Sequence, residues 1–318
     1  ILKKGNIPMN EREIIKATIM YSYVFSMINS SGFIMIITRF VSDMLYLKQT
    51  EDILSSLFGI SALTVLSGGI FSLIFFISSP LGALVKFLSY SLFIELSLIY
   101  ILMTYVSAVK DYKKVTLSFI TGSVLAIVSA VIVYYSGVDI VAGILCSVVL
   151  GYFVNIIFLV FTIKENFSHL SNSAFAFISY FKKHYMLFLI NLFYTTSLFI
   201  HNIIFWKLSS FSKAVMGTYY YAPAYDTATF FAVLTTIPAS IIFVVKFETS
   251  FYEVYRTFLD AIVLGGSLKE LKSSKNRMVG ILKRELAFIT EIQFILTIIF
   301  TIIGASVVLP IFANDRYA

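Results

Sequence analysis

Long, uninterrupted apolar runs are the feature that most restricts what this chain can fold into. Eight of them are long enough to cross a bilayer, since a spanning helix needs about 20 predominantly apolar residues. They lie at approximately 15–38, 57–78, 84–108, 115–135, 138–163, 185–206, 227–245 and 287–312. The turn at 135–139 is short enough to make the fourth and fifth runs an antiparallel hairpin. The sequence therefore predicts an all-α polytopic membrane protein with about eight transmembrane helices.

The composition points to the same class of protein. Hydrophobic residues make up 59% of the chain and charged residues 13%, against about 25% charged residues in soluble domains. A transmembrane β-barrel is excluded, because its strands are short segments of alternating polarity. The single cysteine, Cys146, lies inside an apolar run and is expected to be a buried, inert thiol. Because the chain starts at Ile1 and stops just after the last run, we expect it to be a piece of a longer protein.

The basic residues are divided unequally between the two sets of alternate loops. About two thirds of the 24 basic residues fall in one set, and such an excess marks the cytoplasmic side of multi-pass proteins. The loops of this set include 39–48, 110–114, 164–183 and 246–284. They are predicted to be cytoplasmic, which places the turns between the other spans outside.

Residues 219–256 combine three environments in one passage. A cluster of tyrosines with an acid precedes the apolar span 227–245, and a charged segment follows it. In 248–263 the apolar residues recur at i, i+4, i+7 and i+11, one stripe of a helix. We expect this amphipathic helix to lie in the membrane interface and to end at Gly265 and Gly266.

Two junctions in the chain share an unusual pattern, in which a span is followed by a basic residue, a phenylalanine and a polar linker. They are Arg39-Phe40 and Lys246-Phe247. Repeated halves of this kind are common in secondary transporters. Residues 29–32 (Asn-Ser-Ser-Gly), in the first span, predict a close helix-packing patch.

Several segments, in order over nearly the whole chain, resemble one known family. They are TRFVSDMLY (38–46), HNIIFW (201–206), YDTATF (225–230), FETSF (247–251) and YR with DAI (255–262). With them the sequence resembles the PelG family, the inner-membrane components of Pel exopolysaccharide export, within the multidrug/oligosaccharidyl-lipid/polysaccharide (MOP) flippase superfamily.

The resemblance implies a fold of two six-helix lobes around a central cavity. Residues 1–163 would then be part of the N-terminal lobe, with helices two to six, and 164–184 the cytoplasmic inter-lobe linker. Residues 185–318 would be part of the C-terminal lobe, with helices seven to nine and the amphipathic linker 247–286. The resemblance further implies inner-membrane transport of a partly cationic amino-sugar exopolysaccharide for a biofilm matrix. It also implies a cytoplasmic glycosyltransferase and membrane partners of a Pel-type synthase complex.

Glu95 lies near the centre of the span 84–108. A carboxylate at that depth costs about 2.5 kcal/mol or more, so such residues usually face a cavity or a partner. One interpretation is a cavity-facing group that meets a cationic sugar or a coupling proton. The other is a protonated or paired structural carboxylate between helices.

Four polar residues on the span 185–206 form a second candidate group. Asn191, Tyr194 and Asn202 fall near one helical face, and His201 flanks it. They are either a hydrogen-bonding wall for sugar hydroxyls or interhelical polar contacts, which are worth about 0.6 kcal/mol on average.

The tyrosine cluster is the third candidate. Its members are Tyr219, Tyr220, Tyr221 and Tyr225, followed by Asp226. The cluster is either an aromatic belt at the headgroup level or an outer rim, where rings stack on sugars and Asp226 attracts a basic group.

Charged residues at the two cytoplasmic junctions form a fourth candidate group. They are Arg39, Asp43, Lys246 and Glu248. Arg39 and Asp43, at i and i+4, predict a structural ion pair, and a cytoplasmic gate is the alternative for the group.

The sequence leaves other functions open. They are a lipid-linked oligosaccharide flippase of the same superfamily, an ion-coupled small-molecule exporter, and a membrane scaffold for a polysaccharide synthase. An acidic mid-span residue favours a cationic polymer over a pyrophosphate-linked lipid. The sequence contains no Walker loop, nucleophile elbow or zinc-ligand spacing. We therefore expect no enzymatic activity, no cofactor, no metal site and no nucleic-acid partner.

Overall fold

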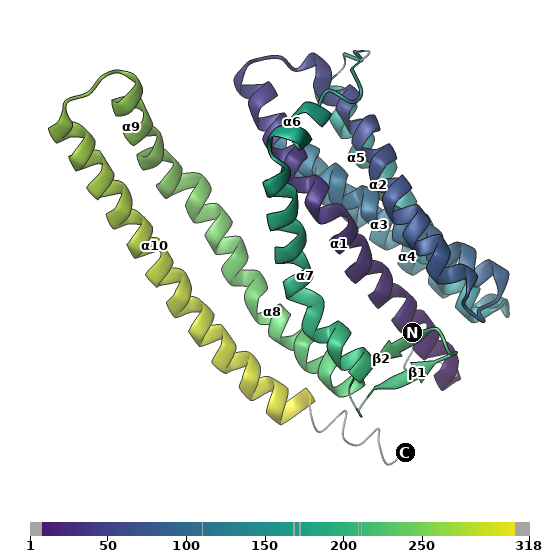
Figure 1. Cartoon of the computed structure of the whole chain (residues 1–318). Coiled ribbons are helices and arrows are strands. Elements are labelled where there is room, and N and C mark those ends of the chain that lie inside the picture. The colour runs from purple at the N-terminus through teal and green to yellow at the C-terminus, as the bar shows by residue number, and fades with distance from the viewer. Residues whose placement is uncertain are drawn as a thin grey trace. The chain divides into compact units, whose positions relative to one another are not determined.

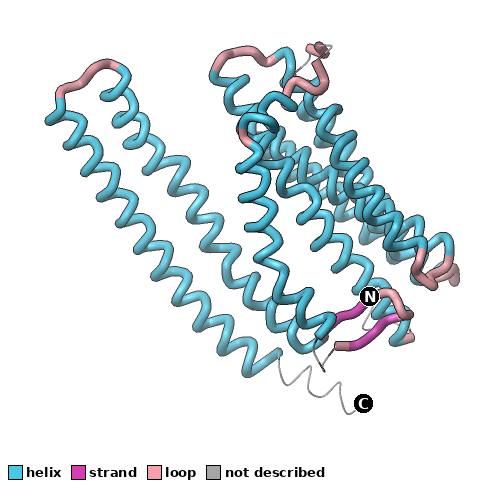
Figure 2. The backbone as a smooth tube through the Cα atoms, in the orientation of Figure 1, coloured by secondary structure: helices cyan, strands magenta, loops and turns pink. Residues whose placement is uncertain are grey.

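The computed structural model describes residues 8–308 apart from positions 110, 168, 172, 209 and 211. In this part of the chain, eight helices are long and apolar enough to cross a membrane, and they coincide with the eight predicted runs. The strands described are those of one two-stranded hairpin (Figure 2). The prediction of an all-α polytopic membrane protein is confirmed.

The chain forms two compact units, Ile1–Ala222 and Pro223–Ala318. The first contains α1 (Met9–Tyr46), α2 (Glu51–Ile77), α3 (Ala83–Val109), α4 (Tyr112–Ser136), α5 (Ile140–Asn166), α6 (Ile178–Lys183), α7 (Tyr185–Leu208), β1 (Lys213–Val215) and β2 (Tyr219–Tyr221) (Figure 1). The second contains α8 (Pro223–Lys246), the π-helical turn η1 (Phe247–Phe251), α9 (Tyr252–Val263), α10 (Leu268–Ile303) and the π-helical turn η2 (Gly304–Val308). The division into lobes at 164–184 stays a prediction.

Helix α1 packs against α2, α3, α5 and α7. The middle of α1 holds the 29–32 patch, and its first two residues contact two different helices. Asn29 Nδ2 donates to the carbonyl oxygen of Thr64 in α2 at 3.2 Å. Ser30 Oγ donates to the carbonyl oxygen of Ser97 in α3 at 3.0 Å.

The other two residues of the patch face α7. Asn191 Nδ2 donates to the carbonyl oxygen of Ser31 at 2.6 Å. Gly32 lies so close to α7 that an added Cβ would overlap the ring of Phe188. Small residues that let helices approach, together with hydrogen bonds between helices, are what hold helices together in lipid. The predicted packing patch is confirmed, and it connects α1 to three neighbours.

Helices α4 and α5 form the predicted antiparallel hairpin. Gly137 ends α4 with φ +70°, a conformation that glycine adopts without strain. Asp139 caps α5 by accepting hydrogen bonds from its first N–H groups. The backbones nearly touch where Gly122 faces Gly151, since a Cβ on either would lie 2.6 Å from the other's carbonyl oxygen. Cys146 is exposed on α5, so the prediction that it is buried was wrong: an apolar run does not tell which face of its helix is covered.

The end of the first unit that is predicted to be cytoplasmic contains an apolar core. It is built by α1, α2, α3 and α5, with Phe177 from the following segment. The described residues after α5 fold over the start of α2. Ser55 Oγ donates to the carbonyl oxygen of Ser171 at 2.9 Å, and Asp52 accepts a hydrogen bond from Ser173. The segment predicted as the inter-lobe linker is therefore packed against α2.

The second unit is a long helical hairpin. Helices α8 and α9 follow each other through η1 without a break, and α10 returns beside them (Figure 1). Gly265, with φ +72°, makes the turn, and Ser267 and Glu270 form a capping box at the start of α10. The amphipathic helix predicted at 248–263 is present, but it continues α8 instead of starting anew in the membrane interface. No glycine or proline interrupts residues 247–252, so the helical hydrogen bonding continues.

We expect the substitution Gly32→Ala to lower the melting temperature of the purified protein in detergent. The new Cβ overlaps the ring of Phe188, and overpacking of this kind costs about 1–3 kcal/mol. Gly82→Ala is the matched control, because nothing lies within 4 Å of a Cβ at that position. Thermal unfolding followed by the fluorescence of Trp206 measures the difference. Equal melting temperatures for the two variants would contradict the packing described for the 29–32 patch.

Candidate functional site

The hairpin β1–β2 lies at the end of the first unit that is predicted to face outside. Its strands are antiparallel, with Lys213 opposite Tyr221 and Val215 opposite Tyr219. Gly217, with φ +63°, lies in the turn between them. Figure 2 shows the hairpin beside the N-terminal end of α1. Most of the predicted tyrosine cluster is on β2.

Hydrogen bonds tie β2 to the N-terminal third of α1. The Tyr21 hydroxyl donates to the carbonyl oxygen of Tyr220 at 2.7 Å and accepts from the N–H of the same residue at 3.0 Å. Thr18 Oγ1 donates to the Tyr219 hydroxyl at 2.9 Å. The Tyr221 hydroxyl donates to Oε1 of Glu13 at 2.6 Å. Three successive residues of β2 therefore bond to α1.

Aromatic and cationic contacts strengthen the same region. The ring of Tyr21 stacks on Trp206 of α7 with centroids 4.8 Å apart, and it meets Tyr219 edge-on at 5.0 Å. Lys207 Nζ lies 4.4 Å from the centroid of the Tyr220 ring. Aromatic and cation–π pairs of this kind are each worth about 0.5–1.5 kcal/mol. The hairpin, which follows α7 in the sequence, is thus also held to α7 and α1 by side-chain contacts.

The turn of the hairpin contacts the turn between α2 and α3. Thr218 Oγ1 and Ser79 Oγ are 2.8 Å apart and share a hydrogen bond. Pro80 lies 3.7 Å from the position that a Cβ would take on Gly217. The hairpin therefore reaches from α1 to the α2–α3 turn. We call residues 213–221, with these contacts, the outer closure.

The predicted tyrosine cluster is split by the structure. Tyr219 is fully buried in the outer closure, and burial raises the pKa of its hydroxyl. Tyr220 and Tyr221 are half-buried and held by the contacts above. Tyr225 and Asp226 belong to the second unit, in the first turn of α8, where the helix dipole favours an acid. The rim for sugars stays a prediction. In this arrangement the ring of Tyr219 is buried and cannot stack on a sugar.

The predicted wall on α7 is also divided. Asn191 makes the interhelical hydrogen bond to α1, and Asn202 is buried. His201 is half-buried beside Asn202. Tyr194 is 62% exposed. Asn191 thus makes the interhelical contact that was one of the two interpretations of this group.

Glu95 lies on the buried face of α3, which packs against α1, α2 and α5. It is 9% exposed, and its Oε2 has no hydrogen-bond partner among the described residues. A buried carboxylate without a partner is costly, so it must either be neutral or meet a ligand. Both interpretations of Glu95 stay open on this geometry.

A cavity of about 50 Å³ lies between α1, α2 and α3. Aromatic rings line most of it, among them Phe71, Phe75 and Phe93. Ser22 contributes an Oγ that has no hydrogen-bond partner in the described part of the chain. A water molecule needs at least about 10–15 Å³, so water fits here while a sugar ring does not.

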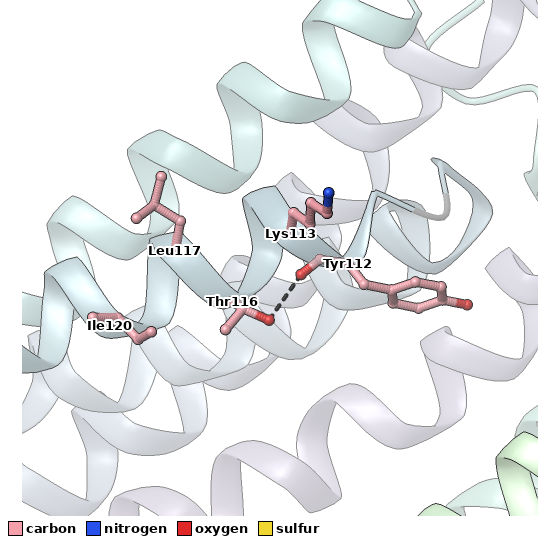
Figure 3. A pocket seen from close by; sticks show the side chains of 5 residues that line it. All are labelled: Tyr112, Lys113, Thr116, Leu117 and Ile120. Carbon is pink, nitrogen blue, oxygen red and sulfur yellow. Dashed lines mark hydrogen bonds between the residues drawn. The ribbon is translucent and has the colours of Figure 1, made fainter.

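A shallow hollow of about 410 Å³ lies on the surface of α4 (Figure 3). Its lining residues all come from this helix: Tyr112, Lys113, Thr116, Leu117 and Ile120. Leu117 and Ile120 are more than half exposed, in a helix with the composition of a membrane span. This hollow suits lipid chains and contains none of the predicted pathway residues.

Arg39 and Asp43 form the predicted ion pair, with Nε and Oδ2 3.2 Å apart. Burial, and then the Asp43 carboxylate, raise the pKa of Tyr180 in α6. The ring of Tyr180 meets Phe40 edge-on at 5.2 Å. The pair therefore lies where α6 packs on α1, and a gating role for it stays a prediction.

Lys246 has a partner that the sequence analysis missed. Its Nζ lies 3.2 Å from Oε2 of Glu285 in α10, and Arg284 lies 3.2 Å from the other carboxylate oxygen. The side chain of Glu285 is only 6% exposed. The side chain of Glu248, the fourth predicted gate residue, lies outside what the structure describes. Glu285 could have been noticed as the one acid between the basic pair 283–284 and an apolar span.

The fold is that of a multi-pass α-helical membrane protein with a β-hairpin packed on one end of its helices. The whole chain, residues 1–318, matches the model of a family described as "PelG: Putative exopolysaccharide Exporter (EPS-E)". The chain belongs to the PelG family of exopolysaccharide exporters. The resemblance carried by its sequence segments is thereby confirmed. No curated protein and no solved structure matches the chain significantly.

We expect Tyr21→Phe to loosen the outer closure. It removes the partner of the part-buried N–H and carbonyl groups of Tyr220, and each hydrogen bond that is lost to water costs about 0.5–1.5 kcal/mol. Hydrogen exchange at 213–221 should therefore become at least several-fold faster. Tyr135→Phe, at an exposed tyrosine of α4, should leave exchange there unchanged. Equal protection in both variants would show that the Tyr21 hydroxyl does not hold the hairpin.

A double-mutant cycle should detect the pair between α8 and α10. Lys246→Met leaves a nearly buried carboxylate with only Arg284, and Glu285→Gln leaves Lys246 without its acid. Since Lys246 is partly exposed, we expect a coupling of about 1–2 kcal/mol rather than the 3–5 kcal/mol of a fully buried pair. The cycle is measured from unfolding in detergent. Additive effects of the two substitutions would contradict the coupling.

Proposed function

We propose that this chain is part of an inner-membrane exporter of a Pel-type exopolysaccharide, a partly cationic amino-sugar polymer of the biofilm matrix. The observation that carries the proposal is the family match over the whole chain. The eight apolar helices support transport through a membrane, and the acidic Glu95 within α3 suits a cationic cargo. The complete protein would follow the two-lobe plan of the MOP flippases.

The outer closure is proposed to be the element that opens when polymer leaves. It bonds α1 and the α2–α3 turn to the segment after α7, which belong to different lobes of the proposed plan. Its hydrogen bonds are the kind that water can replace, at a net cost of about 0.5–1.5 kcal/mol each. An opening of this end would free the hydroxyls of Tyr219 and Tyr221 and the ring of Tyr220. The aromatic rim for sugars would then exist in the open state.

Glu95 is proposed to meet the polymer or a coupling proton within the membrane. Its oxygen without a hydrogen-bond partner supports this role, because a purely structural carboxylate is normally satisfied. The ion pairs Arg39–Asp43 and Lys246–Glu285 are proposed to hold the cytoplasmic entrance. A cytoplasmic glycosyltransferase and membrane partners of a synthase complex would deliver the chain.

Two alternatives predict different products in a strain without the exporter. A lipid-linked oligosaccharide flippase would leave a lipid-bound oligosaccharide in the inner leaflet. A scaffold for a synthase would leave no polymer at all, because synthesis itself would fail. Loss of an exporter would leave polymer inside the cell. Measuring intracellular and extracellular polymer separately therefore distinguishes the three.

The variant Glu95→Gln tests the proposal within the full-length protein. Gln keeps the shape and removes the charge, and a hydrogen bond to a charged group is worth about 1.5–3 kcal/mol, so export should fall about tenfold or more. Glu51→Gln, at an exposed position at the start of α2, is the control. Both variants are compared at equal membrane abundance. Normal export by Glu95→Gln would assign Glu95 a structural role.

A further inference from the structure

The α9–α10 end of the second unit holds a long charged segment between the apolar part of α8 and that of α10. Lys246 and Glu285 form an ion pair where the apolar part of α8 ends and that of α10 begins. From Phe247 to Val263 the helix runs a further 17 residues, which at about 1.5 Å per residue is about 25 Å. We call residues 247–284 the projection. Its charged residues exclude it from the hydrocarbon region.

The projection has cations that no acid of the described chain neutralises. Lys269, Lys272 and Lys275 are exposed on α10 and form no ion pair among the described residues. Helical offsets of 3 and 6 place them within about 120° of one another. The neighbouring acid, Glu270, is already engaged in capping Ser267.

The tip of the projection adds exposed apolar side chains to these cations. Val263 is 80% exposed, and Leu264 and Leu268 are each 83% exposed. They lie on either side of the turn that joins α9 to α10. An apolar centre with charged residues around it is the usual anatomy of a protein interface.

We propose that the projection docks an acidic face of a cytosolic protein, with the apolar tip in contact and the three lysines opposite carboxylates. The charge of the site selects this occupant over the others. Anionic lipid is disfavoured as the occupant. Lys275 lies ten residues before Glu285, about 15 Å along α10 from the start of the apolar part, and salt screens the attraction of lipid headgroups over about 8 Å. A second copy would bring like charges together. The proposal does not depend on which cargo the exporter carries.

The test is site-specific photo-cross-linking in native membranes, in the full-length protein. A photoreactive amino acid replaces Ser273, which is exposed between Lys272 and Lys275. We expect a cross-link to a protein through an acidic segment. Its yield should fall about tenfold in Lys269→Glu/Lys272→Glu/Lys275→Glu, as for opposed charges at an interface. Replacing the acids of the cross-linked segment by lysines should restore the yield.

The control variant Lys113→Glu/Lys182→Glu/Lys183→Glu makes the same change of charge on the same predicted side and should keep the yield. A triple Lys→Gln variant at 269, 272 and 275 repeats the test with residues that favour helix. Four outcomes would each overturn the proposal: a lipid adduct, a cross-link to a second copy, no cross-link, or the same cross-link yield in the wild type and the Lys→Glu variant. Export is measured in parallel, so failure of docking is separable from failure of the proposed transport.

Discussion

The close contact at residues 29–32 of α1 is the interaction on which the first unit depends. In lipid, helices gain little from burying apolar surface against one another, so small residues and hydrogen bonds must hold them together. Here four consecutive residues do so with three helices, through Thr64, Ser97 and the Asn191–Phe188 face of α7. This contact fixes α7 against α1, and it thereby places the following hairpin over the end of α1.

The two ends of the first unit are held by different physical means. The end predicted to be cytoplasmic has an apolar core, with Phe40, Tyr105 and Phe177 fully buried among aliphatic side chains. The other end is held by hydroxyls and aromatic rings around Tyr21. Water can take over those hydrogen bonds when the hairpin moves away, and the apolar surface exposed there is that of a few side chains such as Tyr219. Parting the other core exposes side chains of four helices at about 25 cal/mol per Å². This asymmetry supports the hairpin as the part that moves.

The sequence was sufficient where a feature depends on local pattern. Run length predicted the spans, the 135–139 turn predicted the α4–α5 hairpin, and Gly265 marked the end of α9. It was insufficient where partners are distant in the chain. Nothing near Tyr219 indicates that Thr18 binds its hydroxyl, and nothing near Lys246 indicates Glu285. The stripe at 248–263 predicted a helix correctly, but its direction depends on the backbone that precedes it, so the expected in-plane helix became an extension of α8.

The central claim is that the outer closure must open for polymer to pass, and a reversible lock on it is the most direct test. The hydroxyls of Ser79 and Thr218 are 2.8 Å apart, so cysteines at these two positions are placed to form a disulfide. Cys146, and any cysteine of the full-length exporter outside residues 1–318, is first replaced by serine so that no native thiol competes. In cells carrying the full-length exporter with Ser79→Cys/Thr218→Cys, we expect oxidation to stop polymer export and a reductant to restore it, while each single-cysteine variant exports normally. Undiminished export with the disulfide fully formed would contradict the account.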